Sequence, residues 1–138
     1  HTLIRMHRRD EASVLKDRGI NPTAQRVAVA KYVLHTQEHP SADEVLARVR
    51  VSFPHVSRAT VCNTLNLFVE KDLLRQFVLT EGRVVFDPNT DDHHHFIEDD
   101  SGAIHDVPWG DIEVPEAPSI DGFEVREFQV VMRGKRTN

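Results

Sequence analysis

The residues best suited to chemistry are three consecutive histidines, His93 to His95, near the middle of the chain. On a β-strand successive side chains point to opposite faces, so His93 and His95 share one face and His94 lies on the other. Two imidazoles on one face can bind a metal ion, and Asp87 and Asp106 can add carboxylate oxygens. Such a mixed set of nitrogen and oxygen ligands suits Fe(II), Mn(II) or Zn(II). The alternative interpretation is a solvated His-rich surface stretch.

A second group of polar residues lies on a predicted helix that begins after Ser57. Val61, Leu65 and Phe68 recur at helical spacing and predict one buried face. If this is the second helix of a helix-turn-helix, its first residues face base edges in the major groove. Arginine suits guanine and asparagine suits adenine, whereas phosphate contacts add affinity without sequence choice. The candidates for base contact are Arg58, Thr60, Asn63 and Thr64, and those for phosphate contact are Ser57, Lys16, Arg26 and Arg83.

Capping residues predict the helices that position this recognition helix. One helix is expected over residues 8–18, and a second from a Thr23 cap to about residue 35. Ser41 begins a third helix, with Glu44 at the capping-box spacing. Two β-prone runs follow, residues 74–80 and 83–86, separated by Glu-Gly, which predicts a hairpin. Helices followed by a hairpin predict a winged helix-turn-helix.

The chain as a whole is therefore predicted to be α+β, with three parts. These are a winged-helix DNA-binding domain over 1–86, a hinge over 87–91 with Asp-Pro-Asn-Thr turn chemistry, and a small α/β domain over 92–138. Strands are expected over 93–98, 103–107 and 122–133. A domain of this size buries too little surface to stand alone, so pairing with a second copy is expected.

Composition and charge limit the classes of protein. The 138 residues carry a net charge of −5, but residues 1–82 hold 12 Lys/Arg against 9 Asp/Glu, and residues 83–138 hold 5 against 13. The first half is basic and the second acidic, so a polyanionic partner such as DNA would bind to the first half. The single cysteine, Cys62, excludes an intramolecular disulfide, and no apolar run has membrane-spanning length. A cytoplasmic protein is expected.

Several motifs together resemble the ferric uptake regulator family of bacterial metal-responsive repressors. They are Gly19-Ile-Asn-Pro-Thr-Ala-Gln-Arg26, His39-Pro-Ser-Ala-Asp-Glu44, Ser57-Arg-Ala-Thr-Val-Cys-Asn-Thr-Leu65, Phe86-Asp87 and His93-His-His95. The resemblance covers nearly the whole chain. It implies a winged helix, a hinge and a dimerisation domain, and an active homodimer that binds double-stranded DNA at inverted-repeat operators.

The resemblance also implies a regulatory metal site. In the peroxide-sensing branch the ligand positions correspond to His39, Asp87, His93, His95 and Asp106. Because these come from both domains, bound Fe(II) or Mn(II) would favour the DNA-competent arrangement; Zn(II) could occupy the site on purification. Fe(II) could reduce hydrogen peroxide there, with His39 or His93 as the oxidised ligand.

The chain departs from the family pattern at three features. Glu98 and Ser101 replace the first cysteine pair of the structural zinc site, so no cysteine-bound structural zinc is expected. Cys62 replaces the tyrosine usual in the recognition helix. The His triplet and the proline-broken segment before Gly122 resemble the iron-response (Irr-type) branch. That branch implies haem as an alternative cofactor and iron status as an alternative signal.

Two other classes stay open at this stage. A metalloenzyme could use histidines and carboxylates around a catalytic zinc or iron, but five protein ligands leave little room for substrate. An enzyme also does not need a winged helix, so no enzymatic activity is expected. The other class is a DNA-binding protein that works without metal.

Overall fold

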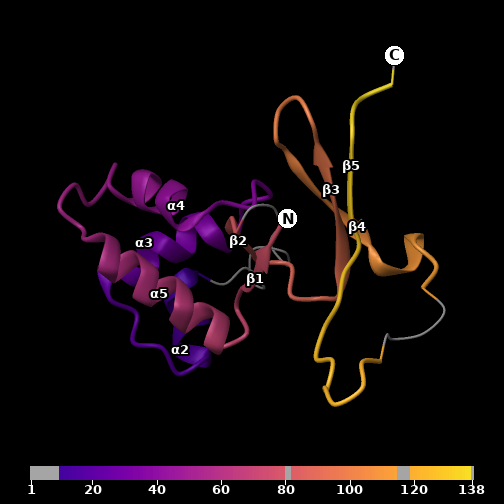
Figure 1. Cartoon of the computed structure of the whole chain (residues 1–138). Coiled ribbons are helices and arrows are strands. Elements are labelled where there is room, and N and C mark those ends of the chain that lie inside the picture. Colours follow the sequence, from indigo (N-terminus) through magenta and orange to yellow (C-terminus); the bar gives the residue numbers. More distant parts are fainter. Residues whose placement is uncertain (1–9, 80–81, 115–118, 138) are drawn as a thin grey trace, which may run out of the picture. The chain divides into compact units, whose positions relative to one another are not determined.

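The computed structural model describes residues 10–79, 82–114 and 119–137. The chain divides into two compact units, residues 1–90 and residues 91–138. Figure 1 shows that the first unit contains the helices and a small hairpin, and that the second is built on a separate sheet. No helix in the described part of the chain combines the length and apolarity that crossing a membrane requires.

Four helices of the first unit begin at side-chain caps. They are α2 (Glu11–Asp17), α3 (Ala24–Val33), α4 (Ala42–Val49) and α5 (Arg58–Glu70). Their N-caps are Asp10, Thr23, Ser41 and Ser57, and each accepts a hydrogen bond from a backbone N–H in the first turn. The predicted capping box is confirmed, because Ser41 and Glu44 exchange side-chain and backbone hydrogen bonds.

The core of the first unit comes from one face of each helix. Leu15 of α2, Val29 of α3, Val45 of α4 and Phe68 of α5 are at most 1% exposed. They belong to one cluster of buried apolar side chains. Burying each large side chain contributes about 1.5–3 kcal/mol, so this cluster holds the helices around α5.

The hairpin after α5 consists of β1 (Arg75–Val78) and β2 (Val84–Asp87), which pair antiparallel. The N–H of Phe86 in β2 donates to the carbonyl of Pro40, just before α4. Phe86 is also part of the helical core. The predicted hairpin is thus a wing fastened to the helices, as the winged helix-turn-helix requires.

The second unit is a three-stranded sheet in the order β4-β3-β5. Its central strand β3 (His93–Glu98) pairs antiparallel with β4 (Ile104–Pro108) and parallel with β5 (Val131–Gly134). A short 3₁₀ turn, Trp109–Asp111, follows β4. The central position of β3 means that its side chains meet residues from both neighbours.

The last strand is shorter than the sequence predicts. A strand was expected over 122–133, but β5 covers only Val131–Gly134. Directly before β5, a competing hydrogen bond interrupts the ladder: the N–H of Val130 donates to Nδ1 of the His94 ring at 2.9 Å. A side chain thus takes the donor that would have extended the ladder.

Candidate functional site

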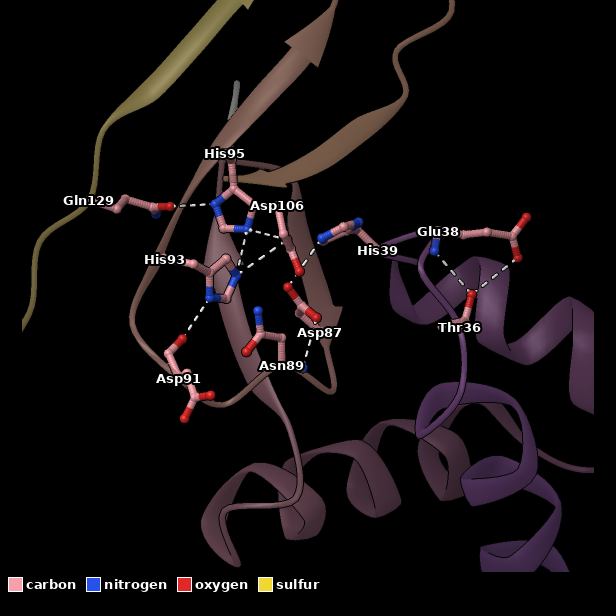
Figure 2. Close-up of polar contacts among 10 residues, drawn as sticks. All are labelled: Thr36, Glu38, His39, Asp87, Asn89, Asp91, His93, His95, Asp106 and Gln129. Carbon is pink, nitrogen blue, oxygen red and sulfur yellow. Dashed lines mark hydrogen bonds and ion pairs between the residues drawn. The ribbon is translucent and has the colours of Figure 1, made fainter. Parts of the chain in front are cut away.

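The two outer histidines of β3 and one aspartate of β4 gather on one face of the sheet. His95 and Asp106 are directly paired across the two strands, which places their side chains side by side. His93 lies two residues earlier and shares the face of His95, as predicted. Nε2 of His93 is 3.1 Å from Nε2 of His95, and Oδ1 of Asp106 is 3.3 Å and 3.4 Å from these two atoms (Figure 2).

The opposite nitrogens of both rings are used in hydrogen bonds. Nδ1 of His93 lies 2.6 Å from the backbone carbonyl oxygen of Asp91, and Nδ1 of His95 lies 2.6 Å from Oε1 of Gln129. A carbonyl oxygen can only accept, so each Nδ1 carries a proton, and the Nε2 of each ring is the atom left to bind an ion. This is the arrangement in which metal-binding histidines are commonly held.

Three atoms that can each act as an acceptor therefore converge. Two imidazole lone pairs and a carboxylate oxygen at 3.1–3.4 Å repel one another unless a cation or a proton lies among them. The histidines are almost completely buried, at 3% and 0% exposed. The donor set thus fits a divalent ion such as Fe(II), Mn(II) or Zn(II).

The middle histidine of the triplet faces away from this cluster. The His94 ring is fully buried and stacks on Trp109, with centroids 4.3 Å apart. Because its Nδ1 accepts from Val130, its proton lies on Nε2, which is buried without a hydrogen-bond partner in the described part of the chain. His94 therefore links β3 to the segment before β5 and is not a member of the acceptor cluster.

A second imidazole–carboxylate pair lies within the first unit. Nε2 of His39 is 3.1 Å from Oδ2 of Asp87, and both side chains are buried. Oδ1 of Asp87 accepts the N–H of Asn89 at 2.9 Å, which fixes the carboxylate at the end of β2. His39 has a φ of 53°, in the left-handed region that costs a non-glycine residue about 1 kcal/mol or more. Such strained residues are concentrated at functional sites.

The recognition helix α5 exposes part of the predicted DNA-reading set. Arg58 and Asn63 are exposed and Thr60 is half-buried. Thr64 was expected on the same outer face, and this expectation is wrong: Thr64 is 4% exposed, and its hydroxyl donates to the Thr60 carbonyl at 2.8 Å. Thr64 lies three residues after the buried Val61, so the helix buries a wider arc than the apolar residues alone indicate.

The other DNA candidates lie on separate elements of the first unit. Lys16 is exposed near the end of α2, and Arg83 is exposed just before β2. Arg26 is half-buried in α3, and its Nη1 donates to the Asn21 carbonyl. The Ser57 hydroxyl accepts from the N–H of Thr60 and donates to its hydroxyl, so it serves the helix cap.

Sequence analysis missed Gln129, which orients His95. The two residues are 34 positions apart, and they meet because β3 pairs parallel with β5. A polar side chain between Phe128 and Val130 was the available signal. His105 on β4 is exposed and bonded to Glu98.

A winged helix that can enter DNA and a histidine–carboxylate cluster that suits a divalent ion define the class as a metal-dependent DNA-binding regulator. The chain belongs to the ferric uptake regulator family, whose family model matches residues 17–133. Members of this family are transcription regulators.

Individual relatives agree with this assignment. The peroxide operon regulator of Bacillus subtilis (strain 168) is 32% identical over 128 residues, which cover 91% of this chain and 88% of that protein. The ferric uptake regulator from Pseudomonas aeruginosa, solved with manganese, superimposes with a TM-score of 0.67 at 25% identity, covering 93% of this chain and 98% of that one. A zinc-bound manganese uptake regulator has a TM-score of 0.68 at 20% identity, covering 94% and 100%. At 20% identity, the similarity to the zinc-bound regulator is evidence for the fold alone.

Proposed function

We propose that this protein is a homodimeric, metal-dependent repressor that binds inverted-repeat DNA and releases it when hydrogen peroxide oxidises its Fe(II) site. The observation that carries this proposal is the convergence of three acceptors, Nε2 of His93, Nε2 of His95 and Oδ1 of Asp106. A cation is what such a cluster attracts. The similarity to a peroxide operon regulator supports peroxide as the signal.

In the proposed site, His39 and Asp87 of the first unit would complete the ligand set. A five-ligand site drawn from both units would couple ion binding to their relative arrangement. The ion then favours the DNA-competent arrangement by its higher affinity for that state. Mn(II) in the same ligands would keep the protein competent without reacting with peroxide.

Fe(II), when bound, would activate hydrogen peroxide beside the ligand rings, and the oxidised ring would supply the two electrons of the net reaction. In the net reaction, one oxygen atom of H₂O₂ adds to an imidazole carbon of His39 or His93, the carbon-bound hydrogen moves to oxygen or nitrogen, and the other oxygen leaves as water. The ring loses aromatic character and its quality as a nitrogen ligand. The remaining residues would hold an ion more weakly, and the DNA-competent state would lose that stabilisation.

The second unit supports the proposed homodimer. Among its described residues, Ile104 and the three histidines of β3 are buried, whereas Ile120 and Phe123 are 57% and 76% exposed. A small sheet with exposed large apolar residues is stabilised when a second copy covers it. Phe123→Ser should therefore lower the dimer fraction in sedimentation-velocity measurements. An unchanged dimer fraction would show that Phe123 does not contribute to the dimer interface.

The test of function is DNA binding with defined metals. Anaerobic protein loaded with Fe(II) or Mn(II) is incubated with duplexes selected from a random pool, before and after hydrogen peroxide. We expect peroxide to abolish binding by the Fe(II) form only, with a mass increase of one oxygen on a peptide containing His39 or His93. His105, an exposed histidine outside the proposed ligand set, is the internal control and should stay unmodified.

Other outcomes separate the alternatives. Binding that persists after peroxide and is lost on adding haem would support the iron-response alternative. Binding unaffected by removal of metal with a chelator would contradict the metal-dependent function. DNA-bound repressors of bacterial chromosomes act in the cytoplasm, which is the location proposed here.

A further inference from the structure

The exposed arginine at the start of the recognition helix is held by a carboxylate of the preceding helix. Nε of Arg58 donates to Oδ1 of Asp43 at 2.8 Å, although both side chains are largely exposed, at 61% and 73%. Arg58 is the first residue of α5, and Asp43 lies in the first turn of α4. The two helices are those of the helix-turn-helix.

The bond to Asp43 uses Nε of Arg58, which is not needed when the two Nη groups contact a base. Within the described part of the chain, the two Nη groups have no hydrogen-bond partner. A guanidinium held through Nε keeps its outer edge, with both Nη groups, free for two parallel acceptors. The O6 and N7 atoms of guanine are such a pair in the major groove.

The backbone of Asp43 lies in a turn that neighbouring residues stabilise. The first turn of α4 is closed by the Ser41–Glu44 capping box, and Oε1 of Glu44 also accepts from Arg83 of the wing at 3.1 Å. The helix dipole favours a carboxylate at this position. Asp43 therefore presents its oxygen from a turn that is bonded on two sides.

We propose that Asp43 is a specificity-determining residue, which holds Arg58 in the orientation that reads guanine. This inference rests on the proposed DNA-binding function of α5. Ordering a long side chain at an interface costs about 0.5–1.5 kcal/mol of free energy. Because Asp43 already orders Arg58 in the free protein, DNA binding has to supply less of this free energy. The gain applies only to DNA in which Arg58 makes its base contact, so it raises discrimination and not general affinity.

The test compares base discrimination in Mn(II)-loaded variants. The wild type selects duplexes from a random 30-bp pool, and Arg58→Ala identifies the base pair whose preference depends on Arg58. Affinities are then measured for the selected duplex and for the same duplex with that base pair changed. Asp43→Asn keeps the shape of the side chain and removes its charge. Glu70→Gln removes one charge from the exposed end of α5 and is the matched control.

We expect Asp43→Asn to bind the selected duplex about three- to tenfold more weakly and the changed duplex within twofold of the wild type. Glu70→Gln should preserve the discrimination ratio. In the Arg58→Ala background, Asp43→Asn should have no effect on that ratio, because its target is absent. Circular dichroism and Mn(II) affinity should be unchanged in every variant.

Three other results would contradict the proposal or the function on which it rests. Tighter binding of both duplexes by Asp43→Asn, with the ratio preserved, would show that Asp43 merely repels DNA and would overturn the proposal. An equal effect in the Arg58→Ala background would also overturn it. A wild-type protein that enriches no sequence would contradict the proposed function itself, whereas enrichment with identical preferences in Asp43→Asn would refute this inference alone.

Discussion

Replacing Gln129 by leucine should weaken metal binding without dismantling the second unit. In the native chain, Gln129 Oε1 keeps the His95 proton on Nδ1 and leaves Nε2 available as a ligand. Leucine has a similar size but accepts no hydrogen bond. The ring can then move its proton to Nε2, where it donates to Asp106, and an incoming ion must displace that proton.

The expected magnitude follows from the role of the contact. Loss of a partner that orients a ligand histidine costs about 10- to 100-fold in metal affinity, or roughly 1.4–2.7 kcal/mol. The metal-free protein should lose less stability, because the tautomer change gives the His95 proton a new partner. Competition with a chromophoric chelator gives the Mn(II) and Zn(II) affinities, and urea unfolding gives the stability of the metal-free form.

Gln129→Glu is the matched control, because it retains an acceptor oxygen at the same reach. It should bind metal at least as tightly as the wild type. The ¹⁵N chemical shifts of the His95 ring should report the proton on Nδ1 in the wild type and in Gln129→Glu, and on Nε2 in Gln129→Leu. If Gln129→Leu keeps its affinity within twofold of the wild type, the proposed role of this contact is refuted.

Three further predictions concern stability and DNA contact. Phe68→Ala should destabilise the first unit by about 3–5 kcal/mol in urea unfolding, because it empties a fully buried core position; a cost below 1 kcal/mol would contradict that packing. Thr64→Val should leave DNA affinity unchanged within twofold, since Thr64 is buried, and a larger loss in a binding titration would show that it contacts DNA. Partial burial raises the pKa of Glu44, but hydrogen bonds from Ser41 and Arg83 outweigh it and hold the pKa below the ordinary 4.5. The melting temperature of Glu44→Gln should therefore lie below that of the wild type above pH 4.5, and the difference should shrink as the pH falls below this value, because protonation removes the stabilisation; a pH-independent difference would refute the assignment.

Local signals in the sequence were sufficient to predict most helices and the hairpin of the first unit. Thr23, Ser41 and Ser57 cap helices because their oxygens reach N–H groups three residues ahead, a contact that neighbouring residues alone determine. The prediction that Thr64 is exposed was wrong for another reason. Its hydroxyl is satisfied within its own helix, so a polar residue type did not require an exposed position.

The second unit depends on contacts between distant positions, which residue spacing does not reveal. The shared face of His93 and His95 follows from strand periodicity and is confirmed. The contacts of Gln129 and Val130 with the His triplet require a parallel pairing between strands at opposite ends of the unit. They also explain why the final strand begins later than predicted.

The stacking of Trp109 on His94 gives this protein an intrinsic optical probe. Trp109 is the single tryptophan in the chain, and it stacks on His94, which lies between His93 and His95 in the sequence and on the opposite face of β3. Any small rotation of β3 when its ligands engage an ion should change the packing around the indole and hence its emission. Paramagnetic Mn(II) should in addition quench that emission at short range, whereas Zn(II) should not. Occupancy of the site can thus be followed in unlabelled protein by fluorescence alone.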